Sequence, residues 1–180
     1  GLVGSEMCIR DRGQFGLGTK TGIDIDGETA GYRGATTGES EGKYLYETFG
    51  QYDSYTTLQL ARYVSVIANG GYLVAPHIVG AVTQGQPNSD KQKTVWTATP
   101  KIQGQVKLDA GEWNTIENGM NRVANGSDAW NTGGSDMHKL TPKVHAKTGT
   151  AETVTNGNQT YTESMVAYTP GQPFAIAMAI

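Results

Sequence analysis

The segment from Lys147 to Glu152 (KTGTAE) combines residue types that can bind an anionic ligand. It follows an extended-looking run, so we expect it to lie on a strand. On a strand the hydroxyls of Thr148 and Thr150 project to the same side, where both can donate to one carboxylate. The ammonium of Lys147 adds positive potential, and Gly149 lets a ligand backbone lie close against the strand. The segment therefore predicts one wall of a site for a carboxylate-bearing peptide.

Such a strand can also serve acyl transfer. Enzymes that acylate a serine with a peptide ending in a free carboxylate must activate the hydroxyl, hold the carboxylate and stabilise the tetrahedral oxyanion. The free edge of the strand can pair with the ligand backbone, and a backbone N–H near Thr150 can complete an oxyanion hole. The same triplet at Lys20-Thr21-Gly22 lies in an apparent loop, and we expect no site there.

The sequence offers one weak candidate for the nucleophile. Ser40-Glu41-Gly42-Lys43 is the only Ser-x-x-Lys, and there is no Ser-x-Asn triplet. A nucleophile helix places its serine and lysine one turn apart on the same face, whereas Gly38 and Gly42 make an ordered first turn costly. We therefore expect one wall of a catalytic cleft without the nucleophilic serine, in a chain that is inactive by itself.

Two helices are predicted from their capping signals. Thr56 begins a capping box (Thr-x-x-Gln), and an apolar stripe runs from it to an Asn-Gly-Gly stop at residues 69–71. Asp109 begins a second capping box (Asp-x-x-Glu), followed by a helix that we expect to end at the Asn-Gly pair of residues 125–126.

Strands and loops make up the rest of the expected fold. The glycine-rich residues 13–50 indicate a surface connection, residues 72–79 short extended pieces interrupted by a proline, and residues 83–108 a long polar excursion. The last two strands are joined by Thr-Pro-Gly-Gln, which favours an antiparallel hairpin. The three predicted strands lie around residues 143–152, 163–169 and 173–180. The expected fold class is α+β.

Composition and charge exclude several function classes. A net charge of −3, with lysines and arginines scattered along 180 residues, makes a nucleic-acid partner unexpected. No stretch approaches the roughly 20 apolar residues of a membrane span. His77, His138 and His145 lack the spacing of a metal site, so we expect neither a metal nor a cofactor. Glu152 and Glu163 could border the mouth of the cleft or be ordinary surface charges.

The two ends of the sequence are atypical of a protein terminus. Residues 1–12, which include Cys8, resemble translated sequencing-adapter sequence, and we expect this segment to be non-native. Residues 174–180 break off in the middle of a strand-like run. We expect residues 13–180 to be one domain, truncated at both ends.

An ordered set of motifs resembles the class B penicillin-binding proteins, and a Gly-Gln-Tyr-Asp-Ser-Tyr variant within it is most similar to the division-type or elongation-type enzymes of Gram-positive bacteria. The set comprises Phe15–Asp24, Gly50–Leu60, Ile67–Gly71, Pro76–Val79, Glu117–Met120 and Lys147–Ala151. The resemblance implies the C-terminal part of a penicillin-binding transpeptidase, or serine β-lactamase-like, fold, with an antiparallel sheet between helices. It places the Ser-x-x-Lys and Ser-x-Asn motifs before residue 13.

The resemblance also implies a function. It is that of a D,D-transpeptidase, which cross-links peptidoglycan stem peptides and is acylated by β-lactams. Lys147 would be catalytic, and Lys147, Thr148, Gly149 and Thr150 would bind substrate. The parent protein would be anchored to the outer face of the cytoplasmic membrane by an N-terminal helix and would meet division or elongation proteins.

Alternative functions share parts of this description. A β-lactamase or D,D-carboxypeptidase has the same cleft but releases the acyl group to water, and a β-lactam sensor domain holds the drug without cross-linking. A non-catalytic cell-wall-binding domain is the alternative from another class. The residues of this chain leave these alternatives open.

Overall fold

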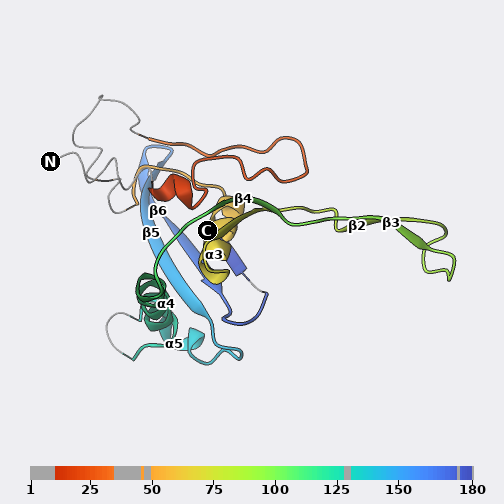
Figure 1. The fold of residues 1–180 in the computed structure, drawn as a ribbon. Helices are drawn as coiled ribbons and strands as arrows, with labels where there is room; N and C mark the ends of the chain where they lie inside the picture. The colour runs from red at the N-terminus through yellow and green to blue at the C-terminus, as the bar shows by residue number, and fades with distance from the viewer. Residues whose placement is uncertain (1–10, 35–45, 47–49, 128–130, 174, 180) are drawn as a thin grey trace.

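A three-stranded antiparallel sheet forms the centre of the structure (Figure 1). Its strands are, in spatial order, β5 (His145–Thr155), β6 (Asn158–Tyr168) and β7 (Ala175–Ala179). Together with the helices packed on it, this sheet confirms the predicted α+β class. The computed structural model describes residues 11–34, 46, 50–127, 131–173 and 175–179, and none of the helices within them is long and apolar enough to cross a bilayer.

β5 and β6 form one long hairpin, in which the two strands pair residue by residue over their whole length. The two residues of the turn, Asn156 and Gly157, have φ angles of 53° and 79°. Two-residue hairpin turns need this left-handed backbone, which Asn-Gly adopts at low cost. The hairpin between β6 and β7 was predicted, whereas the one between β5 and β6 was missed.

Helix α3 (Thr57–Ala68) covers one face of the sheet and has the predicted limits. The Thr56 hydroxyl accepts the backbone N–H of Gln59 at 3.1 Å, and the Gln59 side chain accepts the backbone N–H of Thr56 at 2.9 Å. Val64 and Ile67 are buried against side chains of β6 and β7. Burial of each such side chain contributes about 1.5–3 kcal/mol, so this contact fixes the helix on the sheet.

Helix α4 (Ala110–Asn125) packs along β5 (Figure 1). The predicted capping box at Asp109 is present, and the helix ends at the predicted Asn-Gly pair. Met120 joins the apolar cluster around α3, while Ala124 packs with Ala146 of β5 and neighbouring residues in a second cluster. The start of β5 is therefore held by α4 as well as by β6.

The remaining strands form two separate antiparallel pairs. β1 (Tyr72–Ala75) pairs with β4 (Lys101–Gln105), and β2 (Ala81–Gln84) pairs with β3 (Lys93–Thr97). β1 confirms the short extended piece predicted before the proline. The β2–β3 hairpin projects away from the rest of the chain, and its side chains are exposed (Figure 1). The predicted polar excursion is thus a projecting hairpin followed by a strand that returns to β1.

The first part of the glycine-rich segment, residues 16–21, packs against α3, so the prediction of a surface connection is wrong there. Most of residues 22–34 are exposed, as that prediction requires. Thr21 is fully buried. Arg62 of α3, which is also buried, donates to the carbonyls of Gly16 at 2.5 Å and Thr21 at 3.0 Å. Gln59 donates to the carbonyl of Thr19 at 2.6 Å. Two polar side chains of the helix thus satisfy backbone acceptors that a loop would otherwise bury unpaired.

Two adjacent glycines after α3 give a matched test of the helix stop. Gly70 and Gly71 both have positive φ angles, 75° and 108°. A Cβ on Gly71 would clash with the carbonyl oxygen of Val106, whereas a Cβ on Gly70 would meet nothing within 4 Å. In urea denaturation we expect Gly71→Ala to lower the free energy of unfolding by more than about 3 kcal/mol. Gly70→Ala should lower the free energy of unfolding by about 1–2 kcal/mol. Equal losses in the two variants would contradict the predicted clash with the carbonyl of Val106.

Candidate active site

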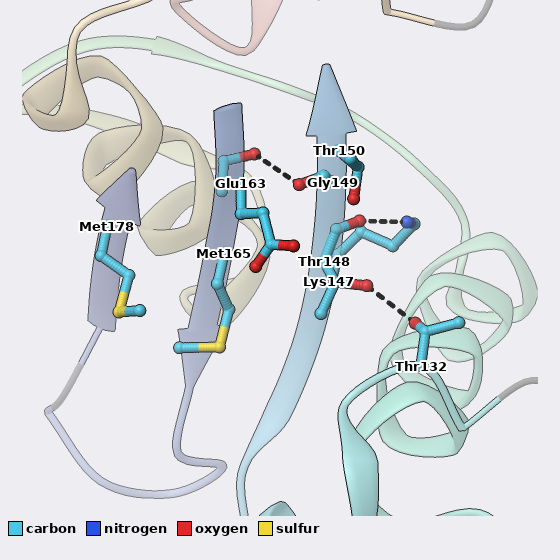
Figure 2. Close-up of a pocket in the computed structure, with 9 residues that line it drawn as sticks. Thr132, Lys147, Thr148, Gly149, Thr150, Glu163, Met165 and Met178 are labelled. Carbon is cyan, nitrogen blue, oxygen red and sulfur yellow. Dashed lines mark hydrogen bonds between the residues drawn. The ribbon is translucent and has the colours of Figure 1, made fainter. Parts of the chain in front are cut away.

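The four predicted site residues lie together on the first half of β5, an edge strand of the sheet. Lys147, Thr148, Gly149 and Thr150 all line one cavity of about 460 Å³ (Figure 2). The two threonines lie on the same face of β5, as their spacing predicted. In the described part of the chain no strand pairs with the other side of β5.

The other side of the cavity comes from β6 and β7, which sequence reasoning did not assign to the site. Met165 lies opposite Thr148 and is itself opposite Met178, while Glu163 lies opposite Thr150. All three of these side chains line the cavity (Figure 2). The sequence allowed two positions for Glu163, the mouth of the cleft or the ordinary surface. The structure places it at the border of the cavity. The cavity combines hydroxyl groups, one carboxylate and two thioethers.

Thr132 reaches the cavity from the loop between α4 and α5 (Gly134–Met137) (Figure 2). Its hydroxyl oxygen lies 2.7 Å from that of Thr148, and either group can donate in this hydrogen bond. The loop is tied to α4, because the backbone N–H of Gly133 donates to the carbonyl of Val123 at 3.0 Å. Nothing local in the sequence around Thr132 indicates a contact with a residue 16 positions away.

Lys147 brings a cation to the boundary between two cavities. Its ammonium donates to the carbonyl of Thr148 at 2.5 Å, and its side chain is exposed. A second cavity, of about 390 Å³, lies between Lys147 and α4 and is lined also by Gly119, Val123 and Thr132. The lysine side chain therefore has open space on the side of α4 as well as on that of the threonines.

Gly149 has little need to be glycine for the fold itself. Its backbone is ordinary strand, and an added Cβ would lie 2.8 Å from the Oγ of Ser164 on β6. A serine hydroxyl can rotate out of the way, so this contact is a weak constraint. The predicted close approach of a ligand backbone at Gly149 therefore stays a prediction.

The start of β5 is fixed by two polar contacts. The side-chain amide of Asn125 donates to the carbonyl of Val144 at 2.8 Å. The Nδ1 of His145 lies 3.0 Å from the hydroxyl of Tyr168, and the two rings meet edge to face at 5.2 Å. Burial raises the pKa of Tyr168 to about 12, with a smaller contribution from Glu117. Burial also lowers the pKa of His145, and Glu117 opposes this shift.

The other residues singled out from the sequence lie elsewhere. Glu152 lines a different cavity with Tyr46, Gln51 and Tyr52. Within the described residues, no group of three His, Cys, Asp or Glu side chains is placed to hold a metal ion. The Ser-x-x-Lys at residues 40–43 lies outside the part of the chain that the structure describes.

Comparison with known proteins decides the family. The sequence profile of the penicillin binding protein transpeptidase domain matches residues 12–180. The chain belongs to this family. Penicillin-binding protein H of Bacillus subtilis is 37% identical over 175 residues, which make up 93% of this chain and 24% of that protein. Penicillin-binding protein 2A of the same organism is 36% identical over 174 residues, with the same coverage.

A solved structure agrees with this assignment. Penicillin-binding protein 2B of Streptococcus pneumoniae strain R6 superposes with a TM-score of 0.78 at 30% identity, covering 95% of this chain and 28% of that one. The incomplete penicillin-binding transpeptidase fold expected from the resemblance is thereby confirmed. The chain spans about a quarter of the length of the curated relatives it matches.

The partly buried His145 predicts a pH dependence of stability in this penicillin-binding transpeptidase domain. The pKa of His145 is lower in the folded state than its ordinary value of about 6.5. The unfolded chain therefore protonates His145 at a higher pH than the folded chain does. The stability that neutral His145 contributes is fully present above pH ~6.5 and is lost as the pH falls toward the folded-state pKa. We expect His145→Asn to show a smaller decrease in melting temperature between pH 7.5 and 5. Coincident profiles for the two proteins would contradict this role.

Proposed function

We propose that this chain is part of a D,D-transpeptidase that cross-links peptidoglycan stem peptides by serine acyl transfer and is acylated by β-lactams. The observation that carries the proposal is the clustering of Lys147, Thr148, Gly149 and Thr150 on an open edge strand around one cavity. Membership of a family named for penicillin binding and transpeptidation supports the same reaction. In this proposal Lys147 is the catalytic residue of the chain, and all four residues bind substrate.

The hydroxyls of the strand would hold the terminal carboxylate of the donor peptide. Hydroxyl bonds to a carboxylate are short and charge-assisted. When Thr132 donates to the oxygen of Thr148, the proton of the Thr148 hydroxyl is free to turn to the ligand. Thr150, two residues on and on the same face, would supply the second donor. Thr132 would thus act as a positioning residue.

The backbone and the cation would serve the reacting carbonyl. A peptide can pair with the open edge of β5 as an added strand, which brings its scissile amide close to Gly149. A backbone N–H near Thr150 would donate to the oxyanion that forms when the serine attacks. The ammonium of Lys147, near the same edge, would stabilise negative charge and help keep neighbouring proton carriers in their active states.

The nucleophilic serine would come from a part of the protein outside this chain, before residue 13. The chain by itself would then be inactive, since its single Ser-x-x-Lys is interrupted by glycine and no Ser-x-Asn is present. We include in the proposal an N-terminal helix that anchors the full-length protein to the outer face of the cytoplasmic membrane. Proteins of the division or elongation machinery would be its partners.

Labelling of the full-length protein with a fluorescent penicillin tests the role of Lys147. We expect Lys147→Ala to lower the rate of acylation by about 100-fold or more, because a positioned charge at the reacting group is lost. Lys143→Ala is the matched control, since Lys143 is an exposed lysine that does not line the cavity, and labelling should be unchanged. Equal labelling of Lys147→Ala and the unmodified protein would rule out the proposed site.

A further inference from the structure

The cavity at β5 carries charges of both signs. Lys147 contributes a cation from β5, and Glu163 contributes a carboxylate from β6 (Figure 2). Within the described residues, no hydrogen bond or ion pair engages the Glu163 side chain, which is exposed to the cavity. The site therefore presents an anion of its own beside the hydroxyls that would bind the ligand carboxylate.

The position of Glu163 bears on which ligands fit. Glu163 lies directly opposite Thr150 on the neighbouring strand, and side chains in such pairs have Cβ atoms about 5 Å apart. A ligand carboxylate bound at Thr148 and Thr150 would lie within reach of the Glu163 carboxylate. The two like charges repel, and more strongly in a partly enclosed site than in bulk water. A ligand that also carries a positive group near Glu163 would turn this repulsion into attraction.

The lining of the cavity next to Glu163 is apolar and adaptable. Met165 lies two residues along β6 from Glu163, about 6.6 Å away, and Met178 lies opposite Met165 on β7. Methionine side chains are flexible and polarisable, so they pack well against a methylene chain. A carboxylate at one end of a strip of thioethers matches an aliphatic side chain that ends in an ammonium group.

We propose that Glu163 is a specificity-determining residue, which binds the ammonium group of an alkyl-ammonium side chain on the peptide substrate. Met165 and Met178 contact the methylenes of that side chain. This inference rests on the function proposed above, and it names a substrate class: stem peptides with a lysine-like side chain. A neutral side chain loses the attraction, and a side chain with a carboxylate beside its amine is repelled.

Competition against fluorescent-penicillin labelling of the full-length protein tests this inference. The competitors are Nα-acetyl-lysyl-D-alanyl-D-alanine and the same peptide acetylated also at Nε. We expect the free ε-ammonium peptide to slow labelling at roughly tenfold lower concentration. In Glu163→Gln the two peptides should compete equally, within about twofold, because glutamine keeps the size and loses the charge. Glu163→Asp keeps the charge on a shorter arm and should retain part of the preference.

Glu152→Gln is the matched control, because Glu152 lies on the same face of the hairpin but lines a different cavity. It should keep the full preference of the unmodified protein. Equal competition by both peptides in the unmodified protein, or an unaltered preference in Glu163→Gln, would overturn the inference. The labelling itself reports on the proposed function and on folding of each variant. If the unmodified protein is not labelled by penicillin, the proposed function is refuted. If it is labelled but shows no preference between the two peptides, only the role of Glu163 is refuted.

Discussion

The register between β5 and β6 is the constraint on which the rest of the site depends. Side chains alternate between the two faces of a sheet, so a slip by one residue would turn both threonine hydroxyls away from the cavity. The Asn156-Gly157 turn fixes the register at one end of the hairpin. At the other end the fully buried Ala146 and the contact between His145 and Tyr168 fix it again. The hydroxyls are thus aimed by core packing and by a turn, neither of which belongs to the cavity.

The same arrangement leaves one edge of β5 available. Exposed edges of strands invite unwanted pairing, and proteins usually cover or disrupt them. Here α4 packs along the start of β5, where the Asn125 side chain donates to the carbonyl of Val144. The next contact along the strand is the hydrogen bond between Thr132 and Thr148. Farther along, within the described residues, the edge has no strand partner. An unpartnered edge beside two hydroxyls and a cation is the feature on which the proposed ligand site rests.

The sequence predicted what is encoded locally. Both capping boxes and both helix stops are present, because a cap and its partner are three residues apart and need no tertiary context. The shared face of Thr148 and Thr150 follows from the period of a strand. The β5–β6 hairpin carried a local signal in Asn156-Gly157 that was overlooked, since the run beyond residue 152 is too polar to indicate a strand by hydrophobicity.

What the sequence could not predict depends on contacts between distant residues. Met165 and Met178 reach the cavity from two other strands through the pairing register. Thr132 reaches it from a loop, through its hydrogen bond to Thr148. The packing of the first part of the glycine-rich segment, residues 16–21, could not be predicted for the same reason. Its backbone is satisfied by Arg62 and Gln59, which lie about 40 residues away in sequence, so glycine content alone could not distinguish a packed segment from a surface loop.

A crystal structure of the full-length protein acylated by a penicillin tests the central claim most directly. We expect the carboxylate of the bound drug within about 3 Å of the hydroxyls of Thr148 and Thr150, with its amide paired along the open edge of β5. A bound drug whose carboxylate lies elsewhere, with both hydroxyls facing solvent, would contradict the account.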